Sequence, residues 1–208
     1  MQRIAFEIKK MVRQAHHKTN KNQLRSIFRQ RLAEISPAER AQKSKTACSN
    51  LISTKQFQNA KVIMFYLPMP QEIDTTDAIL YAWKKDKTVV VPKVFWKQKR
   101  MTAVRISSFE EDFSTDVAGL RNPKNNDEVA PQTIDLIVVP ALVFDRKGFR
   151  LGRGGGYYDK FLANPKLLAK KSGFCFAEQL LEGDNLPVMP NDIPVDLLVT
   201  DKEIILFS

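Results

Sequence analysis

Hydrophobic side chains recur along the first quarter of the chain at the spacing of amphipathic helices. Between residues 20 and 35 the apolar positions lie three and four apart, which puts them on one helix face. These positions are Leu24, Ile27, Phe28, Leu32 and Ile35. Ser36 predicts the start of a second helix, because Pro37 suits the first helical position and Glu39 completes a capping box. We expect this helix to run to about Ser53.

Short runs rich in β-branched and aromatic residues then indicate strands separated by helical segments. The expected strands are 61–67, 88–94, 101–106, 134–139, 173–177, 195–200 and 203–207. A helix beginning at Asp74 or Thr75 separates the first two, and residues 107–132 are polar and irregular. The run 134–139 is apolar throughout, so we expect it to be buried on both faces. This alternation predicts one α/β domain over residues 19–208, a mostly parallel sheet flanked by helices, with 1–18 as an N-terminal extension.

The composition adds a strong positive charge to this globular pattern. The formal net charge is +10, which fits a surface that binds nucleic acid, one that attracts small polyanions, or one that only keeps the chain soluble. No RNA-recognition, KH, zinc-finger or helix-turn-helix signature is found, so we expect no nucleic-acid partner.

The remaining composition excludes other classes of protein. Cys48 and Cys175 lie far apart without a metal-binding motif, which indicates free thiols in a reducing compartment. No apolar run reaches about 18 residues, and residues 1–20 lack the apolar core of a secretory signal. We therefore expect a cytoplasmic protein, without a membrane partner, that is a monomer or weak dimer.

The most informative segment is a glycine-rich loop placed between a predicted strand and a predicted helix. An apolar run ends at Leu142, and a helix is expected to begin at Tyr157. Between them lie the cations Arg146, Lys147, Arg150 and Arg153 and the glycines Gly152, Gly154, Gly155 and Gly156. Glycines let backbone N–H groups approach an anion, and arginines bind phosphate oxygens. The segment predicts a phosphate-binding loop, although it matches neither the Walker nor the dinucleotide fingerprint. A simple tight turn is the alternative.

Four segments together resemble the 5-formyltetrahydrofolate cyclo-ligase family, also called methenyltetrahydrofolate synthetases. Residues 150–159 read RLGRGGGYYD, and 140–145 before them read PALVFD. The segment 21–25, KNQLR, and the segment 66–74, YLPMPQEID, are also similar to that family. The resemblance implies that ATP and 5-formyltetrahydrofolate give 5,10-methenyltetrahydrofolate, ADP and phosphate through a phosphorylated formyl intermediate. It also implies Mg²⁺ as a cofactor.

The resemblance further implies roles for particular residues. Residues expected to bind ATP are Lys21, Arg25, Arg150, Gly152, Arg153, Gly154, Gly155, Gly156 and Tyr157. Residues expected to bind the folate are Arg25, Met69, Asp74, Arg153, Gly154, Gly155, Gly156 and Tyr157. The folate substrate could carry a polyglutamate chain. The catalytic residues are expected to be Arg150, Arg153 and Tyr157.

Several of these residues have plainer interpretations. Lys21 and Arg25 share a helix face, which is also typical of a solvated surface. Asp159 is expected to bind Mg²⁺, but it could simply complement a helix dipole. Asp192 is the second expected metal-binding carboxylate, and Asp196 is its nearby competitor.

Two other functions also fit parts of the sequence. One is a different small ATP-dependent ligase or kinase that uses the same loop on another acceptor. The other is a basic nucleic-acid-binding module without catalysis. Folate-dependent ATP turnover would separate the cyclo-ligase from the other ligase or kinase. Steeply salt-dependent binding to an oligonucleotide, with no ATPase activity, would support the nucleic-acid-binding module.

Overall fold

The computed structural model describes residues 18–110, 113–116, 119–181 and 186–207. Its helices are α2 (Lys18–Ala33), α3 (Pro37–Ser53), α4 (Lys55–Asn59), α5 (Thr76–Lys84) and α6 (Tyr157–Leu162), with 3-10 turns η1 (Pro131–Thr133) and η2 (Ala177–Gln179). Its strands in the first half are β1 (Val62–Met64), β2 (Thr88–Phe95), β3 (Arg100–Ile106), β4 (Phe113–Thr115), β5 (Arg121–Pro123) and β6 (Glu128–Val129). Those in the second half are β7 (Leu136–Val139), β8 (Val143–Asp145), β9 (Arg150–Leu151), β10 (Lys170–Phe174), β11 (Leu180–Leu181), β12 (Leu197–Val199) and β13 (Ile204–Leu206).

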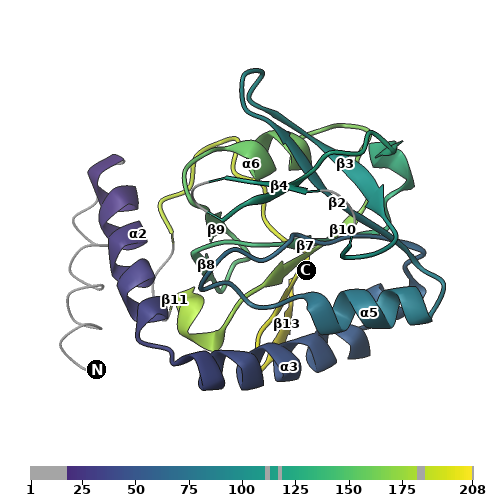
Figure 1. Cartoon of the computed structure of the whole chain (residues 1–208). Coiled ribbons are helices and arrows are strands. Elements are labelled where there is room, and N and C mark those ends of the chain that lie inside the picture. Colours follow the sequence, from purple (N-terminus) through teal and green to yellow (C-terminus); the bar gives the residue numbers. More distant parts are fainter. Residues whose placement is uncertain (1–17, 111–112, 117–118, 182–185, 208) are drawn as a thin grey trace.

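A twisted eight-stranded sheet forms the centre of the described molecule (Figure 1). Its strand order is β13-β12-β10-β7-β1-β2-β3-β6. The neighbours from β12 to β2 pair in parallel, and β13, β3 and β6 pair antiparallel at the two edges. The predicted α/β fold with a mostly parallel sheet is confirmed.

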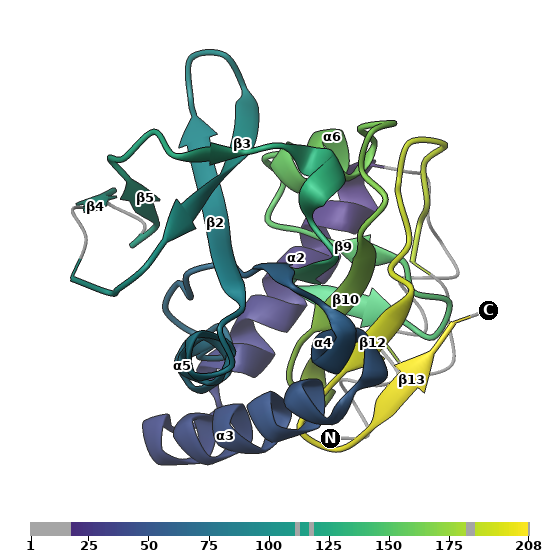
Figure 2. The same ribbon diagram turned by 90° about the vertical axis from the view of Figure 1, so that its right-hand side faces the viewer.

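Side chains alternate between two cores because both faces of the central strands are covered. Ile63 and Val138 pack into one hydrophobic cluster with α3 and α5, represented by Leu51 and Ile79. The next strand positions pack into a second cluster with α6; these are Met64, Val90, Ile137 and Val139. Figure 2 shows α3 and α5 below the sheet and α6 above it. Burial on both faces explains why these strands read as continuous apolar runs.

The first described helix, α2, packs on a separate small sheet of order β11-β8-β9. Leu24 and Phe28 of α2 are fully buried against Val143 and Leu151 of this sheet. The apolar stripe predicted for residues 20–35 therefore exists, on a helix that ends at Ala33. This packing holds the N-terminal helix beside the glycine-rich segment.

Several local predictions are confirmed and others need correction. The side chain of Ser36 accepts a hydrogen bond from the Glu39 backbone, and α3 ends at Ser53 as expected. Residues 107–132 are not wholly irregular, since they contain β4, β5 and β6. The chain also does not pass directly from the buried strand to the glycines. The β8–β9 hairpin intervenes, because Asp145 accepts hydrogen bonds from the backbones of Lys147 and Phe149 and closes a turn there.

The remaining predictions concern the cysteines, membranes and the N-terminus. Cys48 and Cys175 are free and buried, as expected. Among the helices that the structure describes, none combines the length and hydrophobicity needed to cross a bilayer. The predicted extension, 1–18, lies outside the described residues except for Lys18.

Candidate active site

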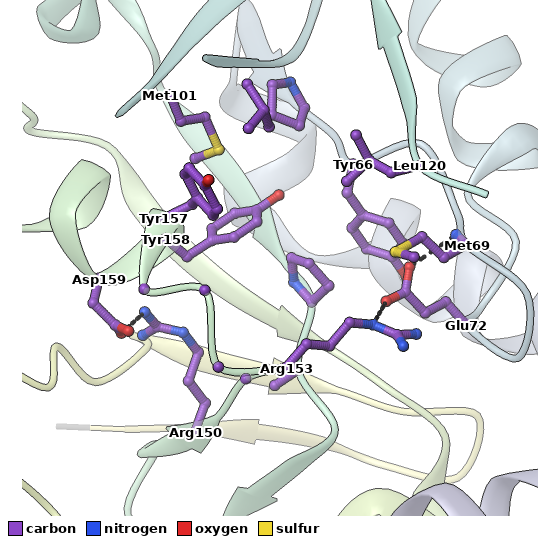
Figure 3. A pocket seen from close by; sticks show the side chains of 18 of the residues that line it. Tyr66, Met69, Glu72, Met101, Leu120, Arg150, Arg153, Tyr157, Tyr158 and Asp159 are labelled. Carbon is purple, nitrogen blue, oxygen red and sulfur yellow. Dashed lines mark hydrogen bonds and ion pairs between the residues drawn. The ribbon is translucent and has the colours of Figure 1, made fainter. Parts of the chain in front are cut away.

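The predicted motif segments meet around one pocket of about 470 Å³ (Figure 3). The lining residues that the sequence predicted are Lys21, Arg25, Met69, Arg150, Gly152, Arg153, Gly154, Gly155, Gly156, Tyr157, Asp159 and Asp192. They come from α2, from the segment after β1, from the β9–α6 connection and from the segment before β12. The structure therefore brings together nearly all of the expected site residues.

The glycine-rich loop, residues 152–156, has a backbone that side chains would disturb. Gly154 has φ of +108°, a conformation that L-residues rarely adopt, and its Cα faces the Arg25 guanidinium. A Cβ on Gly155 would lie 2.8 Å from the Tyr157 ring, so this ring can fold back over the loop only because Gly155 has no side chain. The glycines thus allow the backbone of the loop to lie close to the pocket.

Arg150 lies beneath this loop with its side chain only 3% exposed. Its guanidinium donates to the Ile193 carbonyl at 2.6 Å and forms an ion pair with Asp159 in the first turn of α6. Burial lowers the pKa of Arg150, and the charges of Asp159 and Asp192 oppose that shift. Arg150 therefore joins three chain segments, and its acidic neighbours offset part of the cost of burying its charge.

Lys21 and Arg25 project from α2 onto the other side of the loop. The Arg25 Nε donates to the Gly152 carbonyl at 3.0 Å, and its Nη1 donates to Asn22 at 2.6 Å. The Lys21 Nζ pairs with Asp192 at 3.2 Å. These contacts distinguish both residues from the plainer alternative of a solvated helix surface.

Arg146 and Lys147, two of the loop cations, lie outside the pocket lining. Arg146 pairs with Glu203 at 3.1 Å, on a side of the β8–β9 turn where both side chains are largely exposed. The four cations grouped by sequence are therefore divided by the hairpin. Arg150 and Arg153 reach the pocket, where Lys21 and Arg25 join them.

A carboxylate that sequence reasoning missed, Glu72, faces Arg153 across the pocket (Figure 3). The Arg153 Nε donates to Glu72 Oε1 at 3.0 Å, and the Met69 backbone donates to Glu72 Oε2 at 2.9 Å. The Glu72 side chain is 12% exposed. Burial raises the pKa of Glu72, although Arg153 and the Met69 N–H act in the opposite direction.

Asp74 is the one predicted folate contact that does not line the pocket. Its Oδ1 accepts hydrogen bonds from the Thr76 backbone and hydroxyl at the start of α5. This carboxylate therefore acts at the start of α5, in agreement with the helix expected to begin at Asp74 or Thr75. Glu72, two residues earlier, supplies the carboxylate to the pocket.

Asp159 and Asp192 both line the pocket, whereas Asp196 does not. Asp196 instead pairs with Lys171 at 2.9 Å and with Lys170 at 3.3 Å. Burial acts to raise the pKa of Asp196, but the two lysines outweigh it, so the pKa is lowered. No group of three or more metal-binding side chains occurs among the described residues. Mg²⁺ often uses only one or two carboxylates together with substrate phosphates, and Asp159 and Asp192 fit that donor set.

Aromatic and apolar side chains form the wall that faces the charged residues. Tyr157 meets Trp96 edge to face, with ring centroids 5.5 Å apart. The Tyr158 ring packs with the second core cluster and also lines the pocket. Sequence reasoning missed the other members of this wall, which are Tyr66, Leu67, Pro92, Val94, Trp96, Met101 and Leu120. The alternation of Pro92, Val94 and Trp96 along and just beyond β2 is the signal that could have indicated them.

The chain is similar to known proteins over most of its length. The profile of the 5-formyltetrahydrofolate cyclo-ligase family matches residues 17–201. The chain is 33% identical to 5-formyltetrahydrofolate cyclo-ligase of Mus musculus, over 85% of this chain and 91% of that protein. It is 30% identical to the mitochondrial 5-formyltetrahydrofolate cyclo-ligase of Arabidopsis thaliana, over 89% of this chain and 75% of that protein.

Solved structures give the same result. The NMR structure of Aquifex aeolicus 5,10-methenyltetrahydrofolate synthetase superposes with a TM-score of 0.76 and 32% identity, and the match covers 89% of this chain and 92% of that one. The family profile alone covers most of the chain, including the segments that build the pocket. This chain therefore belongs to the 5-formyltetrahydrofolate cyclo-ligase family.

Proposed function

We propose that this chain catalyses the reaction of its family, the ATP-dependent cyclisation of 5-formyltetrahydrofolate. The formyl oxygen attacks the γ-phosphorus of ATP, a new oxygen–phosphorus bond forms, and ADP leaves. Nitrogen-10 of the folate then attacks the activated formyl carbon. The carbon–oxygen bond breaks, phosphate leaves with the formyl oxygen and the proton of nitrogen-10, and 5,10-methenyltetrahydrofolate remains.

The observation that supports this proposal is a pocket with one cationic and one apolar side. Lys21, Arg25, Arg150 and Arg153 meet at the glycine-rich loop, opposite the aromatic and aliphatic wall. A triphosphate needs fixed positive groups, and a folate ring needs a flat apolar surface with a few polar groups. Phosphoryl transfer depends mainly on positioning and charge stabilisation, so the reaction requires no strong base.

On the cationic side, each residue has a distinct proposed role. Lys21, Arg25 and the backbone of residues 152–157 bind the phosphates, and Arg153 stabilises charge on the transferring phosphoryl group. Arg150 acts mainly by fixing the loop, because its guanidinium is occupied by Asp159 and Ile193. The net charge of +10 also favours the approach of ATP and of polyglutamylated folates.

On the opposite side, we propose that Met69, Glu72 and Tyr157 bind the folate. Met69 packs on the flat part of the ring system. The Glu72 carboxylate keeps acceptor sites beyond those used by Arg153 and the Met69 backbone, so it can accept N–H groups of the pteridine. Tyr157 closes the glycine-rich loop toward the ring.

Mg²⁺, the proposed cofactor, would be held by Asp159 and Asp192 and would neutralise phosphate charge. These carboxylates now pair with Arg150 and Lys21. The same two cations therefore position the acidic side chains at the phosphate end of the pocket.

The oxygen route gives the first prediction. When the substrate carries heavy oxygen in its formyl group, methenyl-folate absorbance should appear only if ATP and Mg²⁺ are both present. Each phosphate released should then contain one labelled oxygen atom. Mass spectrometry of the phosphate measures the label. Unlabelled phosphate alongside normal product would overturn the phosphorylated formyl intermediate, and no product at all would overturn the proposed activity.

Metal dependence gives the second prediction. Asp159→Asn should raise the Mg²⁺ concentration needed for half-maximal rate by about tenfold, because a neutral amide binds Mg²⁺ less well than a carboxylate. Asp192→Asn should do so more mildly. Asp196→Asn is the matched control, which should lower the melting temperature and leave the Mg²⁺ titration unchanged, since Asp196 pairs with Lys171 outside the pocket. An unchanged titration for Asp159→Asn would show that this residue binds no metal.

The two carboxylates near the folate side give the third prediction. Glu72→Gln should raise the KM for 5-formyltetrahydrofolate by about tenfold through a lost charge-assisted hydrogen bond. It should hardly lower the melting temperature at neutral pH, because burial raises the pKa of Glu72 and so disfavours its ionised form in the folded state. Asp74→Asn should leave that KM unchanged, and its amide oxygen can still accept the two hydrogen bonds from Thr76 at the start of α5. The reverse pattern in steady-state kinetics would restore Asp74 as the folate contact.

A further inference from the structure

Trp96 is a large aromatic residue that the fold leaves uncovered inside the pocket. It is 48% exposed, although it lines the pocket together with Tyr157. Single exposed hydrophobic residues are common on protein surfaces. Trp96 differs because it lies at the rim of the pocket, in contact with Tyr157, the residue that directly follows the glycine-rich loop.

The strand pattern explains why Trp96 faces the pocket. Pro92 and Val94 alternate along β2, and Trp96 follows on the same face just beyond the strand end. Met101 pairs with Val94 across the hairpin and lines the pocket as well. The intervening residue, Phe95, is covered by the Arg100 guanidinium at 3.9 Å and by Lys93 at 5.9 Å. The hairpin thus covers one aromatic ring with cations and leaves the other open to the cavity.

The position of Trp96 is fixed by contacts at both ends of the turn. The Trp96 carbonyl accepts a hydrogen bond from the Lys99 backbone at 3.3 Å. The Lys160 Nζ of α6 donates to the Lys99 carbonyl at 3.3 Å, which joins the hairpin tip to the helix that begins with Tyr157. Figure 2 shows this hairpin extending from the sheet on the side of α6. The backbone of the turn that carries Trp96 is therefore joined to α6, the helix that begins with Tyr157, and the two rings lie in contact.

We infer that Trp96 is a substrate-binding residue whose ring packs against the pteridine of the folate. This inference rests on the proposed function. The reacting formyl group is attached to the pteridine, so that ring must lie next to the γ-phosphate and hence next to the end of the loop. Adenine is separated from the γ-phosphate by the ribose and two further phosphates. The ring that reaches the Trp96–Tyr157 pair, 5.5 Å apart, is consequently the pteridine.

Kinetics on Trp96 variants provide the first test. Trp96→Ala should raise the KM for 5-formyltetrahydrofolate by about tenfold, leave the KM for ATP unchanged, and hardly change the melting temperature. Trp96→Phe, which keeps an aromatic ring, should recover most of the loss. Trp83→Phe is the matched control, because Trp83 packs on Phe109 and donates to the Ile106 carbonyl away from the pocket. It should lower the melting temperature and leave both KM values unchanged.

Fluorescence provides a second test that does not depend on turnover, since the chain contains two tryptophans. Trp83→Phe leaves only Trp96, whose emission should change on addition of 5-formyltetrahydrofolate and not of ATP alone. Trp96→Phe leaves only Trp83 and corrects for light absorbed by the folate.

The results of these experiments test the role of Trp96 separately from the proposed function. Normal turnover with an unchanged folate KM in Trp96→Ala would overturn the assignment of Trp96 alone. A response of Trp96 to ATP and not to the folate would assign it to adenine and would also overturn the inference. Absence of product from the wild-type protein would overturn the proposed function together with the inference.

Discussion

One buried guanidinium holds the pocket together. Arg150 leaves the short strand β9, donates to the Ile193 carbonyl and pairs with Asp159 at the start of α6. A buried charge is costly unless it is paired, so these segments are constrained to remain around it. The glycine-rich loop, residues 152–156, lies between Leu151 of β9 and Tyr157 of α6. Its position is therefore set by these two elements. Its open backbone would otherwise be free to adopt many conformations.

The central sheet supplies the second requirement, a crevice at the carboxyl ends of its strands. Tyr66 and Leu67 follow β1, and Pro140 and Ala141 follow β7, which is the neighbour of β1 in the sheet. Open α/β sheets commonly bind ligands at this edge. Helix α2 and the segment from β9 to α6 add the cations Lys21, Arg25, Arg150 and Arg153, and the β2–β3 hairpin adds part of the apolar wall. The pocket therefore combines segments that lie far apart in the chain.

Sequence reasoning succeeded where the information is contiguous. The segment 150–159 contains its own glycines, cations and carboxylate, and the four-residue spacing of Lys21 and Arg25 places them on one helix face. It was less reliable where a long-range contact decides the outcome. Arg146 is near the loop in sequence but is drawn toward Glu203. Glu72 and Asp74 are both acidic, and only the start of α5 determines which of them turns into the pocket. The alternation of Pro92, Val94 and Trp96 puts Trp96 on one face of its hairpin, but only the long-range contact of that hairpin with α6 places this face at the site.

Arg150 organises the pocket by holding the segments around it in place. Arg150→Met compared with Arg153→Met, each followed by thermal unfolding and by calorimetric titration with ATP, tests it most directly. The Arg153 side chain is 37% exposed, so its loss should hardly change the melting temperature and should only weaken ATP binding. Loss of Arg150 should lower the melting temperature and abolish ATP binding, because Asp159 and Ile193 lose their common partner. Wild-type melting and ATP affinity in Arg150→Met would contradict the claim.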